Sequence, residues 1–403
     1  MNDAVAAQYE RWVYPQPVAD LATAEERARV PGGDFARNWH TFWPDQAPRE
    51  DIDVLVAGCG ANSAARYAFH HPKARVVGLD LSAASLAHER HLKNRHALGN
   101  LTLHQGRIED VASLGQTFDF IDVSGVLHHL PDPVAGLRAL GTVLRPTGTI
   151  AVMLYGAYPR AGFYMLREMF QVLGLGQSDA DVAFVKDALD ALPEGHVARA
   201  PLAHTRDIQY DAGLVDTFLH PQDRAYTVPE CLDLVRDAGL SFVGWWDNIL
   251  RYPDGQLRPD TSLYKRVAAL PDEQIWQAME LYSGSIGQQT FAACLPTRES
   301  YRLDFASDAF LDYVPVARAK EVQRPAEVPP GRAAVQRGQL PMYILTPHGS
   351  ALFRQIDGTK SIRACAAAAL PSLGESGRTT AARDAFRFLW RLSYVFLRLP
   401  YGG

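Results

Sequence analysis

The chain has 403 residues, of which 47% are hydrophobic and 21% are charged. Single hydrophobic cores stop growing at roughly 250–300 residues, so this length predicts two domains, and the composition disfavours a disordered chain. A formal net charge of −5 argues against general nucleic-acid binding, which relies on a basic surface. The four cysteines form no CxxC pair, which predicts a reducing compartment and no structural metal.

The N-terminus, MNDAVAAQYERWVYPQP, lacks the basic start and apolar run of a signal peptide. Near the other end, the apolar stretch 381–399 is interrupted by arginines and an aspartate, so we expect an amphipathic helix and no membrane span. The simplest location is the cytoplasm.

From Asp53 to Tyr155, apolar strand-like runs alternate with helical stretches, a pattern typical of a parallel sheet covered on both faces. This alternation predicts an α/β fold with a Rossmann-like sheet. The expected strands are 53–58, 74–80, 101–106, 118–125 and 148–156, and the expected helices are 62–71, 82–97 and 133–144.

The rhythm changes after Tyr155, where a long segment without strands, 157–226, predicts a helical insertion. Thr227 is expected to cap a helix that ends at Gly239, and a strand follows at 241–247. A second insertion, 248–287, precedes the last strand of the domain, at 288–296. The expected division is an N-terminal segment (1–50), a main domain (51–298), and a Pro-rich linker with a small C-terminal α+β module (299–403).

The most informative motif is the turn Gly58-Cys59-Gly60, which lies between the first strand and a helix. Glycines there allow a ligand to approach the backbone, and the helix start offers free N–H groups. Asp80 ends the second strand, where a carboxylate can accept hydrogen bonds from both hydroxyls of a ribose. Together they predict adenosine binding. Ser63 stands where the dinucleotide fingerprint requires glycine or alanine, which disfavours NAD and FAD.

With these residues in place, the chain resembles the class I S-adenosylmethionine-dependent methyltransferases, through five ordered motifs within 53–155. The motifs are VLVAGCGANSA, VVGLDLSAASLA, LHQGRIEDV, FDFIDVSGVLHHLPDP and LRPTGTIAVMLYG. The resemblance implies S-adenosylmethionine as the cofactor, held by Gly58, Cys59, Gly60, Asn62, Asp80, Leu81, Ile108, Glu109, Ser124 and Gly125.

Two positions depart from that family. Asn62 stands where a glycine is usual, and we expect it to keep the turn because asparagine tolerates the left-handed backbone. Arg107 stands where an aspartate often contacts the adenine amine. Arginine cannot accept that hydrogen bond, so the role would pass to Glu109 or to a backbone carbonyl.

Methyl transfer needs positioning and, for a protonated acceptor, a base, but no metal. Candidate catalytic residues are His128, His129 and Tyr155, although packing is the favoured alternative for the two histidines. The candidate acceptor-binding residues are Tyr14, Tyr158, His220, Arg224 and Tyr226. Tyr14 belongs to an aromatic N-terminal segment that resembles the lid of such enzymes, with an amphipathic packing helix as the alternative.

We therefore predict a methyltransferase for a small-molecule acceptor, with a peptide or protein side chain as a less favoured acceptor. Two alternatives stay open: an enzyme that uses S-adenosylmethionine for other chemistry, such as cyclisation of its aminobutyryl arm, and a non-catalytic regulatory protein. The C-terminal stretch LFRQIDGTKSIRACAAA weakly resembles a winged helix that grips peptides. The sequence does not indicate the oligomeric state. Acceptor selectivity is expected to reside in the two insertions and the N-terminal segment, because these can roof the ligand edge of the sheet.

Overall fold

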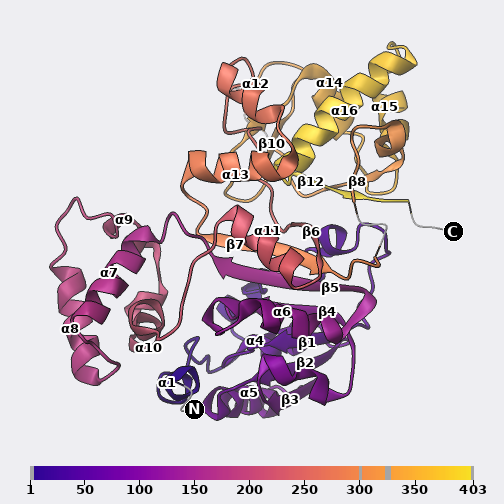
Figure 1. Cartoon of the computed structure of the whole chain (residues 1–403). Coiled ribbons are helices and arrows are strands. Elements are labelled where there is room, and N and C mark those ends of the chain that lie inside the picture. The colour runs from indigo at the N-terminus through magenta and orange to yellow at the C-terminus, as the bar shows by residue number, and fades with distance from the viewer. Residues whose placement is uncertain (1–3, 299–301, 323–327, 401–403) are drawn as a thin grey trace. The chain divides into compact units, whose positions relative to one another are not determined.

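A seven-stranded sheet with the order β3-β2-β1-β4-β5-β7-β6 runs through the first part of the chain (Figure 1). The structure is a computed structural model, and it describes residues 4–298, 302–322 and 328–400. The strands are β1 (Asp53–Ala57), β2 (Arg75–Asp80), β3 (Leu101–Gln105), β4 (Phe118–Ser124), β5 (Leu144–Tyr155), β6 (Ser241–Trp245) and β7 (Gln288–Cys294). Each predicted strand is confirmed within a few residues.

The strands from β1 to β5 pair in parallel, and β7 joins β5 antiparallel. β1 lies between β2 and β4, so the chain order reverses between β1 and β4. Ligands of open α/β sheets bind at such a reversal, outside the carboxyl ends of the strands. The topology therefore points to the segments that follow β1, β2 and β4 as the functional edge.

The connecting helices are α4 (Ser63–His70), α5 (Ala83–Arg95), α6 (Pro133–Thr142) and α11 (Val228–Asp237). α4 packs against α5, and α6 packs against α11. Their starts follow local rules: the Ser82 hydroxyl caps α5, Asp132 caps α6 before Pro133, and Thr227 forms a capping box with Glu230 at α11. The predicted cap at Thr227 is confirmed.

The predicted insertion 157–226 is helical, as expected, with α7 (Ala161–Val172), α8 (Asp179–Asp190), α9 (Arg199–His204) and α10 (Asp211–Leu214). These helices share an apolar cluster that includes Phe163, Phe170 and Phe218. At the N-terminus, α1 (Ala4–Arg11) and α2 (Ala24–Ala28) precede the sheet. The insertion thus has a small core of its own beside the main sheet.

The chain divides into two compact units, and the division differs from the predicted boundaries. One unit holds residues 1–37, 49–242 and 284–297, and the other holds 38–48, 243–283 and 298–403. Most of the second predicted insertion, 248–287, therefore clusters with the C-terminal part. The reason is that residues 243–283 make most of their contacts with the C-terminal part. The order of elements along the sequence does not show such contacts.

The second unit is α+β. Its helices are α3 (Trp39–Phe42), α12 (Ser262–Ala268), α13 (Asp272–Ser283), α14 (Pro347–Phe353), α15 (Ile362–Ala369) and α16 (Glu375–Arg391). Its strands are β8 (Val314–Ala317), β9 (Lys320–Glu321), β10 (Ala334–Gln336), β11 (Tyr343–Ile344) and β12 (Val395–Arg398). β9, β10 and β11 form one antiparallel sheet and β8 pairs with β12. The winged-helix likeness stays a prediction.

The predicted helix over 381–399 is wrong at its end. α16 stops at Arg391, Ser393 takes a positive φ of 54°, and 395–398 continue as β12. The buried side chains of Val395 and Leu397 alternate with less buried ones, which suits a strand paired on one side. Part of the predicted linker, Lys320 and Glu321, is strand β9, whereas 323–327 lie outside the described residues. Among the described residues, none of the helices has the length and apolar content needed to cross a bilayer.

Candidate active site

A cavity with a volume of about 280 Å³ lies at the functional edge of the sheet. Its walls come from the residues that follow β1, β2, β3 and β4, from the last residues of β5 and from the N-terminal segment. They include Val5, Tyr9, Tyr14, Pro15, Gly58, Cys59, Gly60, Ser63, Asp80, Leu81, Arg107, Ile108, Glu109, Ser124, Gly125, His129, Met153 and Tyr155. Most of the residues predicted to hold the cofactor are therefore brought together in one cavity.

The turn after β1 requires glycine at two positions. Gly58 and Gly60 have positive φ angles of 71° and 56°. A Cβ on Gly58 would lie 2.5 Å from a methyl carbon of Val126, and one on Gly60 would lie 2.8 Å from Pro15 Cδ and 2.9 Å from the Tyr14 carbonyl. Any side chain here would collide with its neighbours, so the two glycines make the close packing around the cavity possible.

Asp80 connects the turn to the start of α5. Its Oδ2 accepts a hydrogen bond from the Gly60 amide at 2.7 Å, and its Oδ1 accepts one from the Ser82 amide at 2.8 Å. Burial raises the pKa of this carboxyl, and the backbone amides oppose that rise. Each oxygen keeps a second lone pair, so the carboxylate can brace the loop and still accept ribose hydroxyls in the cavity.

At the other end of the cavity, His129 and Tyr155 are the candidate catalytic residues that contribute to the wall. His129 Nδ1 lies 3.0 Å from the carbonyl oxygen of Gln222. That oxygen can only accept, so Nδ1 carries the ring proton and Nε2 is left as the acceptor nitrogen. Tyr155 is a protonated donor, because burial raises the pKa of its phenol well above the usual range.

A buried polar cluster lies behind these two residues. The Tyr9 hydroxyl donates to Asp216 Oδ1 at 2.9 Å and lies 3.4 Å from His220 Nε2. The His220 ring stacks on His129 with their centroids 4.0 Å apart. Burial raises the pKa of the Asp216 carboxyl, and it lowers the pKa of His220 well below the usual range. The cluster thus holds a neutral His220 and a tyrosine hydroxyl next to the candidate base.

The other predicted residues lie outside the cavity wall. His128 is buried next to Tyr155, and among the described residues neither of its ring nitrogens has a hydrogen-bond partner. Tyr158 is exposed, Tyr226 is buried in backbone contacts with β5, and Arg224 pairs with Glu230 at 3.0 Å. These four stay predictions as functional residues.

Asn62 also lies outside the wall, and its backbone prediction is wrong. Its φ of −142° is not left-handed. The glycines on either side of Cys59 carry the turn, so nothing demands a left-handed residue at position 62. The Asn62 side chain instead contacts the N-terminal segment, as described below.

Sequence reasoning missed Asp216, Tyr9 and Glu89. Asp216 had a signal, since it is a single acid inside the apolar run 214–219, and buried acids need partners. In the sequence Tyr9 is only one of several aromatic residues of the N-terminal segment, and nothing distinguishes it from the others. Glu89 carried no signal, because it is one of several charged residues of α5.

Two groups of side chains in this region have the composition of metal sites: His128, His129 and Asp223, and His129, Asp216 and His220. Their hydrogen bonds argue against this use. His220 Nδ1 accepts the Gln222 amide at 2.9 Å, which leaves the ring proton on Nε2, and His129 Nδ1 is committed to a carbonyl. A metal ligand needs a nitrogen without a proton, so in these tautomers neither His220 Nε2 nor His129 Nδ1 can be a ligand, and the absence of a metal stays a prediction.

Comparison with known proteins shows which family model and which proteins this chain is similar to. Residues 55–150 match the model of a family described as a methyltransferase domain. The chain is 28% identical over 301 residues to an uncharacterized protein from Synechococcus, covering 71% of this chain and 70% of that protein. It is 33% identical over 132 residues to trans-aconitate 2-methyltransferase from Deinococcus radiodurans, covering 32% of this chain and 47% of that protein.

Among solved structures, PKMT2 from Rickettsia typhi in complex with AdoHcy shares the fold, with a TM-score of 0.63 and 16% identity. The match covers 93% of this chain and 78% of that one. The chain thus carries a methyltransferase domain at residues 55–150, on a fold that it shares with this AdoHcy-bound structure. The cofactor of the chain is S-adenosylmethionine.

The cavity fits this methyltransferase cofactor. The turn at Gly58 and Gly60 has no room for side chains, Asp80 offers free lone pairs where ribose hydroxyls are expected, and Leu81 and Ile108 give apolar walls for an adenine ring. Glu109 shares that wall and can accept a hydrogen bond in place of the aspartate that Arg107 replaces.

Proposed function

We propose that this methyltransferase modifies a small molecule at a protonated acceptor atom, such as a hydroxyl oxygen, with His129 as the base. The observation that carries the proposal is the His129 ring: it borders the cavity, and its Nδ1 is fixed on the Gln222 carbonyl at 3.0 Å. This leaves Nε2 to take a proton. When bound, the cofactor supplies an electrophilic methyl group on a sulfonium.

The acceptor would lie between His129, Tyr155 and Tyr9. Tyr155 is a protonated donor that can orient the acceptor, and Tyr9 is held by Asp216. With the cofactor bound to supply the methyl group, His129 would take up the proton that the acceptor atom loses on methylation. His220, stacked on that ring, would keep the imidazole in place while it becomes charged.

Two further points support a small acceptor. The side chains at this end come from α1, from the segment after β4 and from β5, and Asp216 of the insertion 157–226 holds Tyr9 from behind, so four parts of one unit build the acceptor end. Concave sites of this kind suit small molecules. By their names, relatives such as trans-aconitate 2-methyltransferase and ubiquinone biosynthesis O-methyltransferase act on small molecules.

The test uses S-adenosylmethionine with an isotopically labelled methyl group and a cell extract separated by ultrafiltration into small molecules and macromolecules. We expect enzyme-dependent label in a small molecule by mass spectrometry, and its loss with His129→Gln. His91→Gln, an exposed histidine of α5, is the matched control and should retain labelling. Label confined to proteins would show a protein acceptor, and full labelling by His129→Gln would remove the base from the proposal.

A further inference from the structure

The N-terminal segment crosses the cofactor-binding turn. Tyr14 and Pro15 form part of the cavity wall, and both lie within about 3 Å of where a Cβ of Gly60 would be. After this crossing, the chain continues over the start of α4. The segment Tyr14–Val18, called the strap below, therefore completes the cofactor cavity from outside the sheet.

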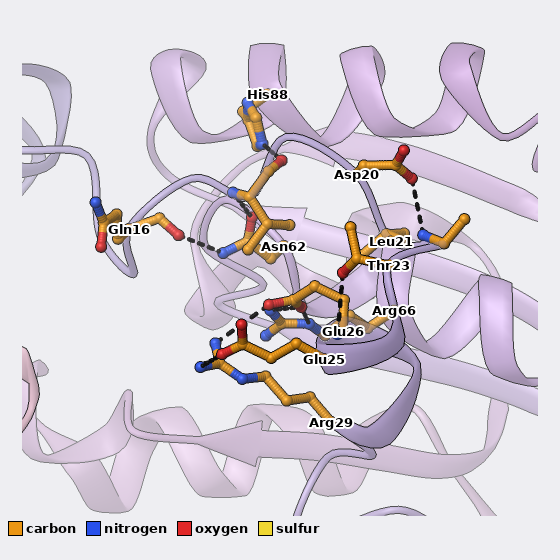
Figure 2. A network of polar contacts seen from close by, with 12 residues as sticks. Gln16, Asp20, Leu21, Thr23, Glu25, Glu26, Arg29, Asn62, Arg66 and His88 are labelled. Atoms are coloured by element: carbon orange, nitrogen blue, oxygen red, sulfur yellow. Dashed lines mark hydrogen bonds and ion pairs between the residues drawn. The ribbon is translucent and has the colours of Figure 1, made fainter.

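Asn62 binds the strap through both atoms of its side-chain amide. Its Nδ2 donates to the Gln16 carbonyl at 3.0 Å, and its Oδ1 accepts from the Val18 amide at 3.1 Å (Figure 2). Asn62 is only 1% exposed, so water cannot easily replace these bonds. An amide side chain can donate from its nitrogen and accept at its oxygen at the same time, whereas an aspartate could only accept and a glycine could do neither.

The position of Asn62 makes this use unexpected. It directly precedes α4, where asparagine normally caps the helix with its own oxygen. In the described chain Asn62 makes no cap hydrogen bond. Instead Glu89 of α5 accepts from the Ala64 amide at 2.9 Å and from the Ala65 amide at 2.8 Å. Because Glu89 caps α4 from the side, the Asn62 amide is available to the strap.

From Val18, the last residue of the strap, onward, the chain is also held by contacts that do not involve Asn62. His88 Nε2 lies 2.8 Å from the Val18 carbonyl, Asp20 pairs with Arg95 at 2.7 Å, and Glu26 pairs with Arg66 of α4. Figure 2 shows this anchored stretch beside Asn62. The strap is thus tied at its far end to α4 and α5, and Asn62 fixes Gln16 and Val18, which directly follow the residues that cover the turn.

We propose that Asn62 is a positioning residue that latches the strap over the glycine turn and so slows the release of the cofactor and its product. Asn62 does not border the cavity itself, and it acts through Tyr14 and Pro15. The inference concerns the cofactor side alone and is independent of the proposed acceptor and base.

The test measures S-adenosylhomocysteine dissociation by stopped flow for Asn62→Ala and Asn62→Gly. Loss of two buried hydrogen bonds is expected to raise the dissociation rate roughly ten- to hundred-fold, with faster hydrogen exchange of peptides that cover 14–18. Asn100→Ala is the matched control, because Asn100 Nδ2 also holds backbone carbonyls, those of Ala68, His71 and Ala74, away from the cavity. It should lower the melting temperature and leave the dissociation rate unchanged.

Val18→Pro removes the strap's donor while leaving Asn62 intact, so it tests the latch even where Asn62 variants fold poorly. It should also speed dissociation, and the Val18→Pro, Asn62→Ala double variant should be little faster than Asn62→Ala. If folded variants of both kinds release S-adenosylhomocysteine within two-fold of the wild-type rate, or if Asn100→Ala accelerates release equally, the latch is refuted.

Discussion

Asp80 offers the sharpest test of the cofactor site. The structure shows a partly buried carboxylate with one backbone amide on each oxygen, at 2.7 and 2.8 Å. Asp80→Ala would remove these two bonds and the acceptors offered to the ribose. Charge-assisted hydrogen bonds contribute roughly 1.5–3 kcal/mol each.

For the ribose alone, the loss of two such bonds corresponds to about 3–6 kcal/mol, or roughly two to four powers of ten in affinity. Asp80→Asn keeps the size of the side chain and one acceptor oxygen, but its amide group would face one of the two backbone N–H groups. We expect a loss of roughly ten- to hundred-fold for this milder change. Both variants should also melt earlier, because the bonds to Gly60 and Ser82 brace the loop.

The assay is calorimetric titration with S-adenosylhomocysteine, with circular dichroism to establish that each variant is folded. Asp110→Ala removes an exposed acid of the same charge from the neighbouring 3-10 helix, and it should bind like the wild type. Unchanged affinity in folded Asp80→Ala would refute the assignment of this carboxylate to the ribose.

Three further predictions follow from the same contacts. Gly60→Ala should abolish S-adenosylhomocysteine binding in calorimetry because its Cβ meets the strap, whereas Gly115→Ala, with a similar φ of 65° and no described atom within 4 Å, should cost only about 1 kcal/mol of stability; equal binding by both would contradict this. Burial raises the pKa of Glu89 from 4.5 to about 8, so the folded chain keeps a proton that the unfolded chain loses. The stability that this group contributes should be full below about pH 4.5 and fall as the pH rises to about 8, and urea titrations of Glu89→Gln should lack that part of the pH dependence. His220→Ala should reduce methyl labelling while S-adenosylhomocysteine affinity stays within a few-fold. The same result is expected for Arg224→Ala, and unchanged labelling by that variant would leave Arg224 as a surface partner of Glu230 only.

Local rules of sequence predicted the sheet well. The strand runs, the glycine turn and the spacing to Asp80 are all set by neighbours in the chain, and the cavity brings them together. Asn62 shows where such rules end. Its sequence position predicts a turn or a cap, but a glutamate 27 residues later takes the cap, and only the fold brings the two together.

The same limit applies to the acceptor end and to the C-terminal part. Tyr9 and Asp216 are separated by 207 residues, so no local pattern could pair them. The apolar content of 381–399 fits a helix and a strand alike, and the pairing of Val395 with Ala317 selects the strand for its last residues. Long-range contacts decided each of these points.

The capping of α4 by Glu89 has a consequence for how this site can evolve. The side-chain amide of Asn62 has two possible sets of hydrogen-bond partners: the backbone N–H groups at the start of α4, or the strap. As long as Glu89 accepts hydrogen bonds from the start of α4, the Asn62 side chain binds only the strap. A substitution that removes the Glu89 carboxyl group would make the helix start and the strap compete for Asn62. Whenever the Asn62 side chain rotated toward the helix, it would release the strap. The effect of losing Glu89 should therefore depend on the residue at position 62, so that the two positions are expected to change together rather than singly.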